Sequence, residues 1–135
     1  MKMLRSVWDA LFQQARTDYP VEACGYLGAV GEMVVAAYPL TNVDGASDHF
    51  SLEPKEQLDA VREMRAKGQR LMGVYHSHGD SPPWPSPEDV RLAYDPEAVH
   101  VIVSIGDGSP SIAAFRIRNG EVSIVPVEWV ESTGP

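Results

Sequence analysis

Two histidines and a later aspartate are the residues of this sequence best suited to chemistry. His76 and His78 are separated by one residue, and Asp89 follows a proline-rich loop. If residues 71–78 form a strand, both imidazoles point to one face, about 6.6 Å apart at Cα, and can reach one ion. Catalytic zinc takes three protein ligands and leaves a fourth position for water. The pattern predicts a zinc site in which Asp89 supplies the natural third ligand.

The sequence around Asp89 predicts a rigid helix start. Ser86 is a good N-cap residue, Pro87 suits the first helical position, and acidic residues suit the first turn. We expect a helix from Ser86 to about Tyr94, with Asp89 facing back toward the loop Gly79–Pro85. Neither His-x-His nor Ser-x-x-Asp is specific alone, because both are common in structural roles. Their combination, where a strand, a loop and a helix are each expected, is a strong signal.

Periodicity elsewhere predicts an α/β sandwich. Apolar residues at helical spacing indicate helices over 3–17, ending at Tyr19-Pro20, and over 53–68, ending at Gly68. Strands are predicted at 22–30, 32–40, 71–78, 99–105, 111–118 and 121–127, with turns at Val30-Gly31-Glu32, Gly106-Asp107-Gly108 and Asn119-Gly120. The order αββαβαβββ implies helices packed on a mixed sheet, in one domain over residues 1–135.

Composition narrows the classes of function. The chain has 135 residues, 44% of them hydrophobic, which is enough for a packed core. Its 11 basic and 19 acidic residues give a net charge of −8, which argues against nucleic acid as a partner. No apolar run is long enough to span a bilayer, and the charged N-terminal stretch does not fit a signal peptide. With Cys24 as its one cysteine, the chain is expected to be soluble and cytoplasmic.

These residues resemble the motifs of the JAMM (MPN+) metallopeptidases. His76-Ser77-His78, seven residues, Ser86, two residues and Asp89 are similar to the family's metal-binding motif. Upstream, Glu22-Ala23-Cys24-Gly25-Tyr26-Leu27-Gly28 is similar to its first motif, a glutamate before a small-residue stretch. The resemblance covers nearly the whole chain and implies an MPN-type, cytidine-deaminase-like fold. It departs at Gly79, where the family usually has proline.

The resemblance also implies a mechanism and a substrate class. His76, His78 and Asp89 would bind one zinc ion, Glu22 would act as the general acid/base, and Ser86 would stabilise the tetrahedral intermediate. Family members cleave peptide or isopeptide bonds after the Gly-Gly tail of ubiquitin-like proteins, and compact prokaryotic members resemble processors of sulfur carriers. The long insertions of eukaryotic deubiquitinases are missing, so linkage-specific cleavage of polyubiquitin is not expected.

Several alternatives remain at this stage. A non-catalytic MPN-type scaffold would typically have lost metal ligands, and a metallohydrolase of small peptides would need no ubiquitin-like partner. A zinc nucleoside deaminase needs a Cys-x-x-Cys pair that the chain lacks. Cys24 is expected to be a small buried residue rather than a nucleophile. Trp84 could line a substrate channel or simply pack within its loop, and a groove beside an edge strand would suit an extended diglycine tail. Oligomeric state is not predicted.

Overall fold

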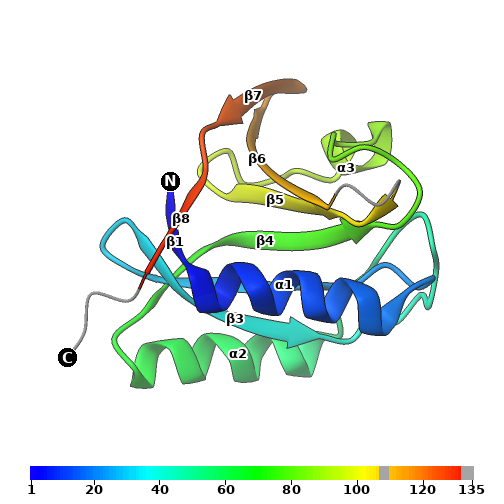
Figure 1. Ribbon diagram of the computed structural model, residues 1–135. Coiled ribbons are helices and arrows are strands. Elements are labelled where there is room, and N and C mark those ends of the chain that lie inside the picture. Colours follow the sequence, from blue (N-terminus) through cyan, green and yellow to red (C-terminus); the bar gives the residue numbers. More distant parts are fainter. Residues whose placement is uncertain (107–109, 132–135) are drawn as a thin grey trace.

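A computed structural model describes residues 1–106 and 110–131. Eight strands form one mixed sheet in the order β7-β6-β5-β4-β2-β3-β1-β8, and helices cover it (Figure 1). The strands are β1 (Lys2–Leu4), β2 (Cys24–Val30), β3 (Met33–Leu40), β4 (Arg70–His78), β5 (Val99–Ser104), β6 (Ser111–Arg118), β7 (Glu121–Val125) and β8 (Glu128–Val130). The helices are α1 (Arg5–Asp18), α2 (Pro54–Ala66) and α3 (Pro87–Arg91). The predicted α/β architecture with a mixed sheet is confirmed.

The two longer helices pack with separate sets of buried residues. The apolar stripe of α1, including Leu11 and Phe12, joins the main core, with which Ala37 of β3 also packs. Met64 of α2 packs with Tyr38, the next residue of β3. Because successive side chains of a strand point to opposite faces, α1 and α2 cover opposite faces of the sheet.

Strand β4 lies in the interior of the sheet, antiparallel to β2 and parallel to β5. Tyr75 is buried in the core on the α1 side, where its hydroxyl bonds to the side chain of Gln14. The alternation of side chains therefore directs His76, and with it His78, to the face that carries α2. The end of β4 thus presents both histidines on one side of the sheet, as the sequence predicted.

Several predicted boundaries are wrong at their ends. Residues 2–4 pair in parallel with β3 and β8 as strand β1, so the helix predicted from residue 3 begins at Arg5. Glu22 lies before β2, because its N–H bonds to the carbonyl of Ala46 rather than to a neighbouring strand. The strand predicted over 121–127 ends at Val125.

The third helix is shorter than predicted. It ends at Arg91 instead of continuing to about Tyr94, and none of its residues is buried, so no packing favours a longer helix. The turn at Asn119-Gly120 is confirmed, with φ of 53° and 80°. The predicted turn at 106–108 lies in part outside the described residues. Gly68, expected to end α2, has a φ of 70° directly after the C-cap residue Lys67.

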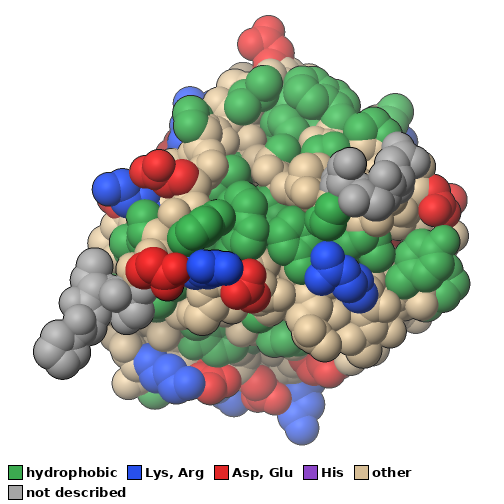
Figure 2. Space-filling model, in the orientation of Figure 1, with side chains coloured by type: hydrophobic (Ala, Val, Ile, Leu, Met, Phe, Trp, Pro, Cys, Tyr) green, Lys and Arg blue, Asp and Glu red, His purple; other side chains and the backbone are tan. Residues whose placement is uncertain are grey.

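Figure 2 shows the face of the molecule that carries α1. Hydrophobic side chains gather over its centre and upper part, and no histidine is visible there. Charged side chains of both signs lie along its lower edge. Among the described residues, no helix is both long enough and apolar enough to cross a membrane.

Candidate metal centre

The two histidines at the end of β4 converge on one point. Their Nε2 atoms lie 3.2 Å apart, and both side chains are buried, with residue exposures of 2% for His76 and 8% for His78. The Nδ1 of His78 lies 2.9 Å from the carbonyl oxygen of Pro82. Because only a protonated Nδ1 can bond to a carbonyl, this contact leaves the Nε2 lone pair of His78 directed at the shared point.

Asp89 reaches the same point from the start of α3. Its Oδ2 lies 3.2 Å from Nε2 of His76 and 3.9 Å from Nε2 of His78. The predicted N-cap is confirmed: the hydroxyl of Ser86 accepts a bond from the N–H of Asp89, and the N–H of Ser86 donates to Oδ2 of Asp89. This reciprocal capping box fixes the carboxylate toward the histidines.

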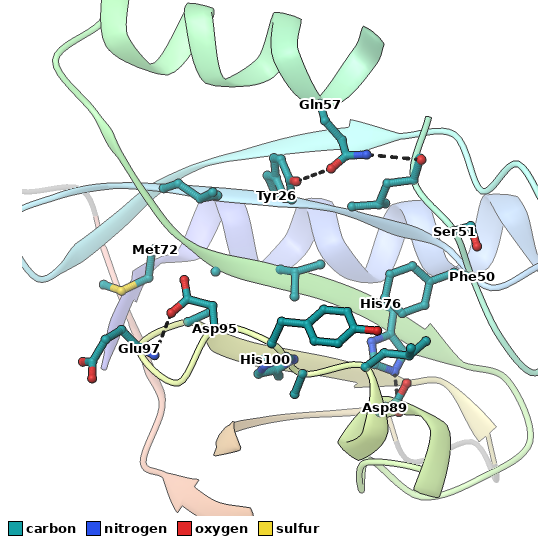
Figure 3. A pocket seen from close by; sticks show the side chains of 18 of the residues that line it. Tyr26, Phe50, Ser51, Gln57, Met72, His76, Asp89, Asp95, Glu97 and His100 are labelled. Atoms are coloured by element: carbon teal, nitrogen blue, oxygen red, sulfur yellow. Dashed lines mark hydrogen bonds and ion pairs between the residues drawn. The ribbon is translucent and has the colours of Figure 1, made fainter. Parts of the chain in front are cut away.

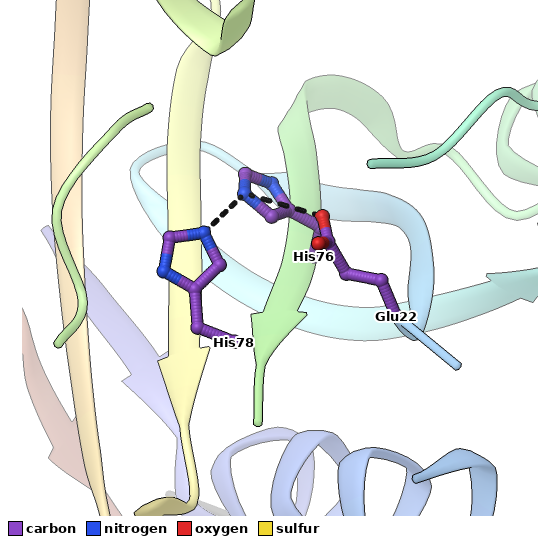
Figure 4. Close-up of side chains that lie close together, drawn as sticks. All are labelled: Glu22, His76 and His78. Carbon is purple, nitrogen blue, oxygen red and sulfur yellow. Dashed lines mark hydrogen bonds and ion pairs between the residues drawn. The ribbon is translucent and has the colours of Figure 1, made fainter. Parts of the chain in front are cut away.

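Glu22 approaches from the segment before β2. Its Oε1 lies 3.7 Å from Nε2 of His76, and one ligand atom from each of Glu22, His76 and His78 lies within 4.8 Å of the others (Figure 4). The next residue, Ala23, is tied to Ser77 of β4, because its N–H donates to the Ser77 hydroxyl and its carbonyl accepts from the Ser77 N–H. Two nitrogens and two carboxylates therefore share one buried space.

A cation would stabilise the ionised carboxylates of this cluster. Burial, and then the charge of Asp89, raises the pKa of the Glu22 carboxyl to about 8. Burial opposes ionisation of Asp89 as well, but His76 and the bonds from Ser86 lower its pKa to about 2. Burial also lowers the pKa of His78, which favours its neutral form. A divalent cation would stabilise both carboxylates and use the free imidazole lone pairs.

Comparison with known proteins identifies the domain. The family of prokaryotic homologues of the JAB domain matches residues 4–118. A CysO-cysteine peptidase of Mycobacterium tuberculosis is 36% identical over 126 residues, covering 91% of this chain and 86% of that protein. A desampylase of Haloferax volcanii is 33% identical over 103 residues, covering 71% of this chain and 74% of its own. The solution structure of a Desulfitobacterium hafniense protein superposes with a TM-score of 0.87 at 35% identity, covering 97% of this chain and 93% of that one.

The chain belongs to the JAB-domain family.

This membership confirms the family and the fold that the sequence motifs predicted. The names of the relatives also confirm the prediction of a hydrolase of the peptidase class. The JAB family is metal-dependent, and the structure of this JAB domain brings together a group of residues that could hold an ion.

The departure at Gly79 has a structural counterpart in this JAB domain. A Cβ atom at position 79 would lie 2.7 Å from Cε2 of Tyr19, which occupies that space. The hydroxyl of Tyr19 also donates to Oδ1 of Asp80 at 3.3 Å. The ring of Tyr19 therefore packs where a larger residue after His78 would lie, and it supports the loop from outside.

A groove leads away from the metal centre of the JAB domain along β4. It has a volume of about 610 Å³, and Figure 3 shows it from close by, with Met72 at one end and His76 and Asp89 at the other. Phe50 forms part of the wall beside the centre, where its ring stacks on His76 with centroids 4.8 Å apart. Strand β4 pairs with β2 along the groove but with β5 only from Gly73 onward, so residues 70–72 have a free edge where they line the groove.

Two further residues singled out in the sequence lie away from this groove. Trp84 is half exposed and packs edge-to-face on Phe115 of β6, with ring centroids 5.1 Å apart, and it is not among the groove-lining residues. The position favours the loop-packing alternative. Cys24 is fully buried, and burial raises the pKa of its thiol to about 12, which fits an unreactive residue.

Sequence reasoning missed two residues beside the centre. Asn42 and Phe50 both lie in the segment that connects β3 to α2, and composition alone describes its residues 41–49 as a polar loop. No spacing rule connects either to the histidines, although an isolated aromatic residue within a polar loop is a signal that could have drawn attention to Phe50.

Proposed function

We propose that this protein is a zinc-dependent peptidase that hydrolyses the bond after the C-terminal Gly-Gly tail of a ubiquitin-like or sulfur-carrier protein. The observation that carries the proposal is the convergence of two imidazole nitrogens and a carboxylate oxygen, separated by 3.2, 3.2 and 3.9 Å. The names of the relatives supply the substrate class, since one is a CysO-cysteine peptidase and another a desampylase.

The proposed ligands fit one zinc ion. Zinc lies about 2.0 to 2.2 Å from histidine nitrogens and carboxylate oxygens, and tetrahedral geometry then separates any two ligand atoms by roughly 3.4 Å. The three separations between His76, His78 and Asp89 fall around this value. Two nitrogens and one carboxylate also match the ligand type of catalytic zinc in peptidases, with a fourth position open. We therefore assign the metal ligands to these three residues and leave Glu22 free.

Glu22 is proposed as the general acid/base. Bound zinc would supply Lewis-acid polarisation and lower the pKa of a coordinated water from 15.7 to about 7. The Glu22 carboxylate, beside His76, would accept a proton from the attacking water and return it to the leaving amine. With a pKa of about 8, the carboxyl would be largely protonated at neutral pH, so a neighbouring cation is needed to keep this base ionised.

Ser86 is proposed to stabilise the developing oxyanion of the scissile carbonyl. Its oxygen accepts the bond from the N–H of Asp89 at 3.0 Å, and that bond leaves the hydroxyl hydrogen able to donate. Loss of one such donor typically costs about 2.7 to 4 kcal/mol of transition-state stabilisation.

The groove is proposed to hold the substrate tail. Residues 71–74 and His76 of β4 line it over a length of about 17 Å from the rise of a strand, which suits roughly five extended residues. Because β4 is paired on both sides from Gly73 to His76, the part of the tail beside the centre would lie across the face of the sheet, next to Phe50. Glycines would pass most easily beside the buried centre, since they have no side chains.

A cleavage assay with matched substrates tests this function. Sulfur-carrier fusions ending in Gly-Gly would be followed by a cysteine, by a peptide, or by a lysine isopeptide, and zinc-loaded protein should release the carrier from at least one. The control is the same fusion with the final glycine replaced by valine, which should resist cleavage. Hydrolysis of dipeptides without cleavage of any fusion would favour a small-peptide hydrolase. Retention of less than about half an equivalent of zinc after gentle purification would favour a scaffold.

A further inference from the structure

Asn42 lies where β3 leads into the loop whose Phe50 stacks on His76, and its side chain bonds backbone groups of this loop. The side-chain nitrogen donates to the backbone carbonyls of Glu22 at 3.1 Å, His49 at 3.0 Å and Ala46 at 3.4 Å. The side-chain oxygen accepts from the N–H groups of Asp44 and Ser51, both at 3.2 Å. The amide nitrogen faces three carbonyls, and the amide oxygen faces two N–H groups. This arrangement fixes the orientation of the amide, because in the flipped amide the oxygen would face the carbonyls and the nitrogen would face the N–H groups.

One of these bonds acts on Glu22 directly. Because Glu22 precedes β2, no strand neighbour fixes its backbone. Its carbonyl accepts from Asn42, and its N–H donates to the carbonyl of Ala46 at 2.8 Å, a carbonyl that Asn42 also bonds. Both backbone groups of Glu22 are therefore held by a loop segment whose shape depends on Asn42.

The same loop reaches a histidine of the centre. The carbonyl of Ser51 accepts from the N–H of Val43 at 3.0 Å, and Asn42 forms an isolated β-bridge with Leu52. These contacts close the loop next to Phe50, whose ring stacks on His76 with an interplanar angle of 26°. Asn42 thus links the backbone of Glu22 to the loop whose Phe50 stacks on His76. The Glu22 carboxylate and the His76 imidazole lie 3.7 Å apart.

We propose that Asn42 is a positioning residue that sets the backbone of Glu22 and the Phe50 stack on His76, and so determines turnover without binding the metal. The inference rests on the proposed role of Glu22 as general acid/base. Asparagine suits this task because it offers two donors and a carbonyl oxygen in one short side chain, and it can satisfy a tight loop as a backbone group would. Displacement of a reacting group by about 1 Å can reduce a rate on the order of 100-fold.

Two variants of Asn42 distinguish the bonds that its side-chain nitrogen donates from those that its side-chain oxygen accepts. Asn42→Asp keeps the size and the accepting oxygen, but it places a second oxygen against the carbonyls of Glu22 and His49. Asn42→Ala removes both sets of bonds without adding charge. Asn119→Asp is the matched control, because Asn119 lies in the β6–β7 turn at a φ of 53°, a conformation that aspartate tolerates.

We expect the Asn42 variants to lose turnover while they keep zinc and substrate binding. Both Asn42 variants should retain one equivalent of zinc. Their KM for the carrier fusion should stay within about 3-fold of the wild-type value, while their kcat should fall about 10- to 100-fold. Asn119→Asp should match wild type in zinc content, KM and kcat. Wild-type kcat in a folded Asn42→Asp protein would overturn the inference, and so would a large rise in KM with kcat unchanged.

Hydrogen exchange and NMR give readouts that do not depend on cleavage. In Asn42→Asp, the N–H of Glu22 should exchange faster while those of Asp44 and Ser51 stay protected. In Asn42→Ala, all three should lose protection, and the ring-current shift of the His76 protons caused by Phe50 should shrink. If wild-type protein cleaves no carrier fusion, the proposed substrate is wrong, and these measurements still decide the role of Asn42. Unchanged exchange and shifts in both variants would overturn it.

Discussion

The hydroxyl of Ser77 and the backbone N–H of Ala23 form a buried hydrogen bond of 2.8 Å that joins the strand of His76 and His78 to the residue after Glu22. Ser77 lies between the two histidines, and the alternation of β4 directs its side chain away from theirs. The motif therefore does two things at once: its histidines face the centre, and its serine fixes the chain that carries the proposed base.

Replacement of Ser77 by threonine or valine tests this link with a matched pair. Threonine and valine are both branched at Cβ and have nearly the same shape, but only threonine keeps a hydroxyl to accept from Ala23. The valine variant should lose about 1 to 3 kcal/mol of unfolding free energy relative to threonine, since a buried N–H is left without an acceptor. Its kcat should also be lower at equal zinc content. Denaturant unfolding and steady-state kinetics measure both effects, and identical behaviour of the pair would contradict the link.

The sequence predicted the parts of the centre that depend on local geometry. The period of a strand places His76 and His78 together, and the capping box turns Asp89 back toward them across a short loop. The parts that depend on contacts distant in sequence were not predictable in detail. Glu22 reaches the centre through the pairing of β2 with β4, and a resemblance to the family, rather than any spacing rule, pointed to it.

The fold follows the same division. Helices and strands with several periodic residues were predicted, whereas β1 and β8 were not. Each of these has three residues, too few for a period to be recognised, and they pair with each other across the length of the chain. The loop that contains Asn42 and Phe50 forms through side-chain bonds to backbone groups, which leave no regular pattern in the sequence.

Glu22→Gln should retain zinc and lose turnover. The amide has the same shape but cannot accept the proton of the attacking water, so kcat should fall by about 10²- to 10⁴-fold. Zinc content should match that of the wild type, because the proposed ligands are unchanged. Metal analysis and single-turnover cleavage of a carrier fusion provide the measurements. Turnover close to the wild-type rate in a zinc-loaded sample would remove Glu22 from the mechanism.

His78→Ala should lose both zinc and activity. The variant removes one of three proposed ligands and leaves Asp89 and His76 facing an open space, so tight binding of the ion should fail. His49→Ala is the control, since the His49 imidazole pairs with Asp48 and Asp44 outside the centre. Zinc per protein after dialysis distinguishes the two. Stoichiometric zinc in the His78 variant would mean that Glu22 or another group is the third ligand.

Trp84→Ala should affect stability rather than substrate binding. The ring packs on Phe115 and is 51% exposed, so its removal should reduce the unfolding free energy by about 1 kcal/mol. KM for a carrier fusion should stay within about 2-fold of the wild-type value, because Trp84 is not among the groove-lining residues. A larger rise in KM at unchanged stability would restore the role in substrate binding that the sequence first indicated.

The raised pKa of Glu22 predicts that the unfolding free energy of the metal-free protein falls as the pH rises. Burial, and then the charge of Asp89, raises this pKa from 4.5 to about 8. A carboxyl with a higher pKa in the folded chain stabilises the fold fully below its unfolded pKa, and this contribution is lost as the pH rises to the folded pKa. Metal-free wild type should therefore lose unfolding free energy between pH 4.5 and 8, whereas Glu22→Gln lacks this contribution.

Thermal unfolding in the presence of a chelator measures this difference. The Tm of Glu22→Gln should rise relative to that of wild type as the pH increases from 5 to 8. The lowered pKa of Asp89, about 2, acts in the opposite direction but only below about pH 4, outside this window. Saturating zinc should flatten the trend, because a divalent cation favours the ionised carboxylate that the metal-free fold disfavours. Parallel Tm curves for the two proteins without zinc would show that Glu22 is not held in a desolvated, acidic environment.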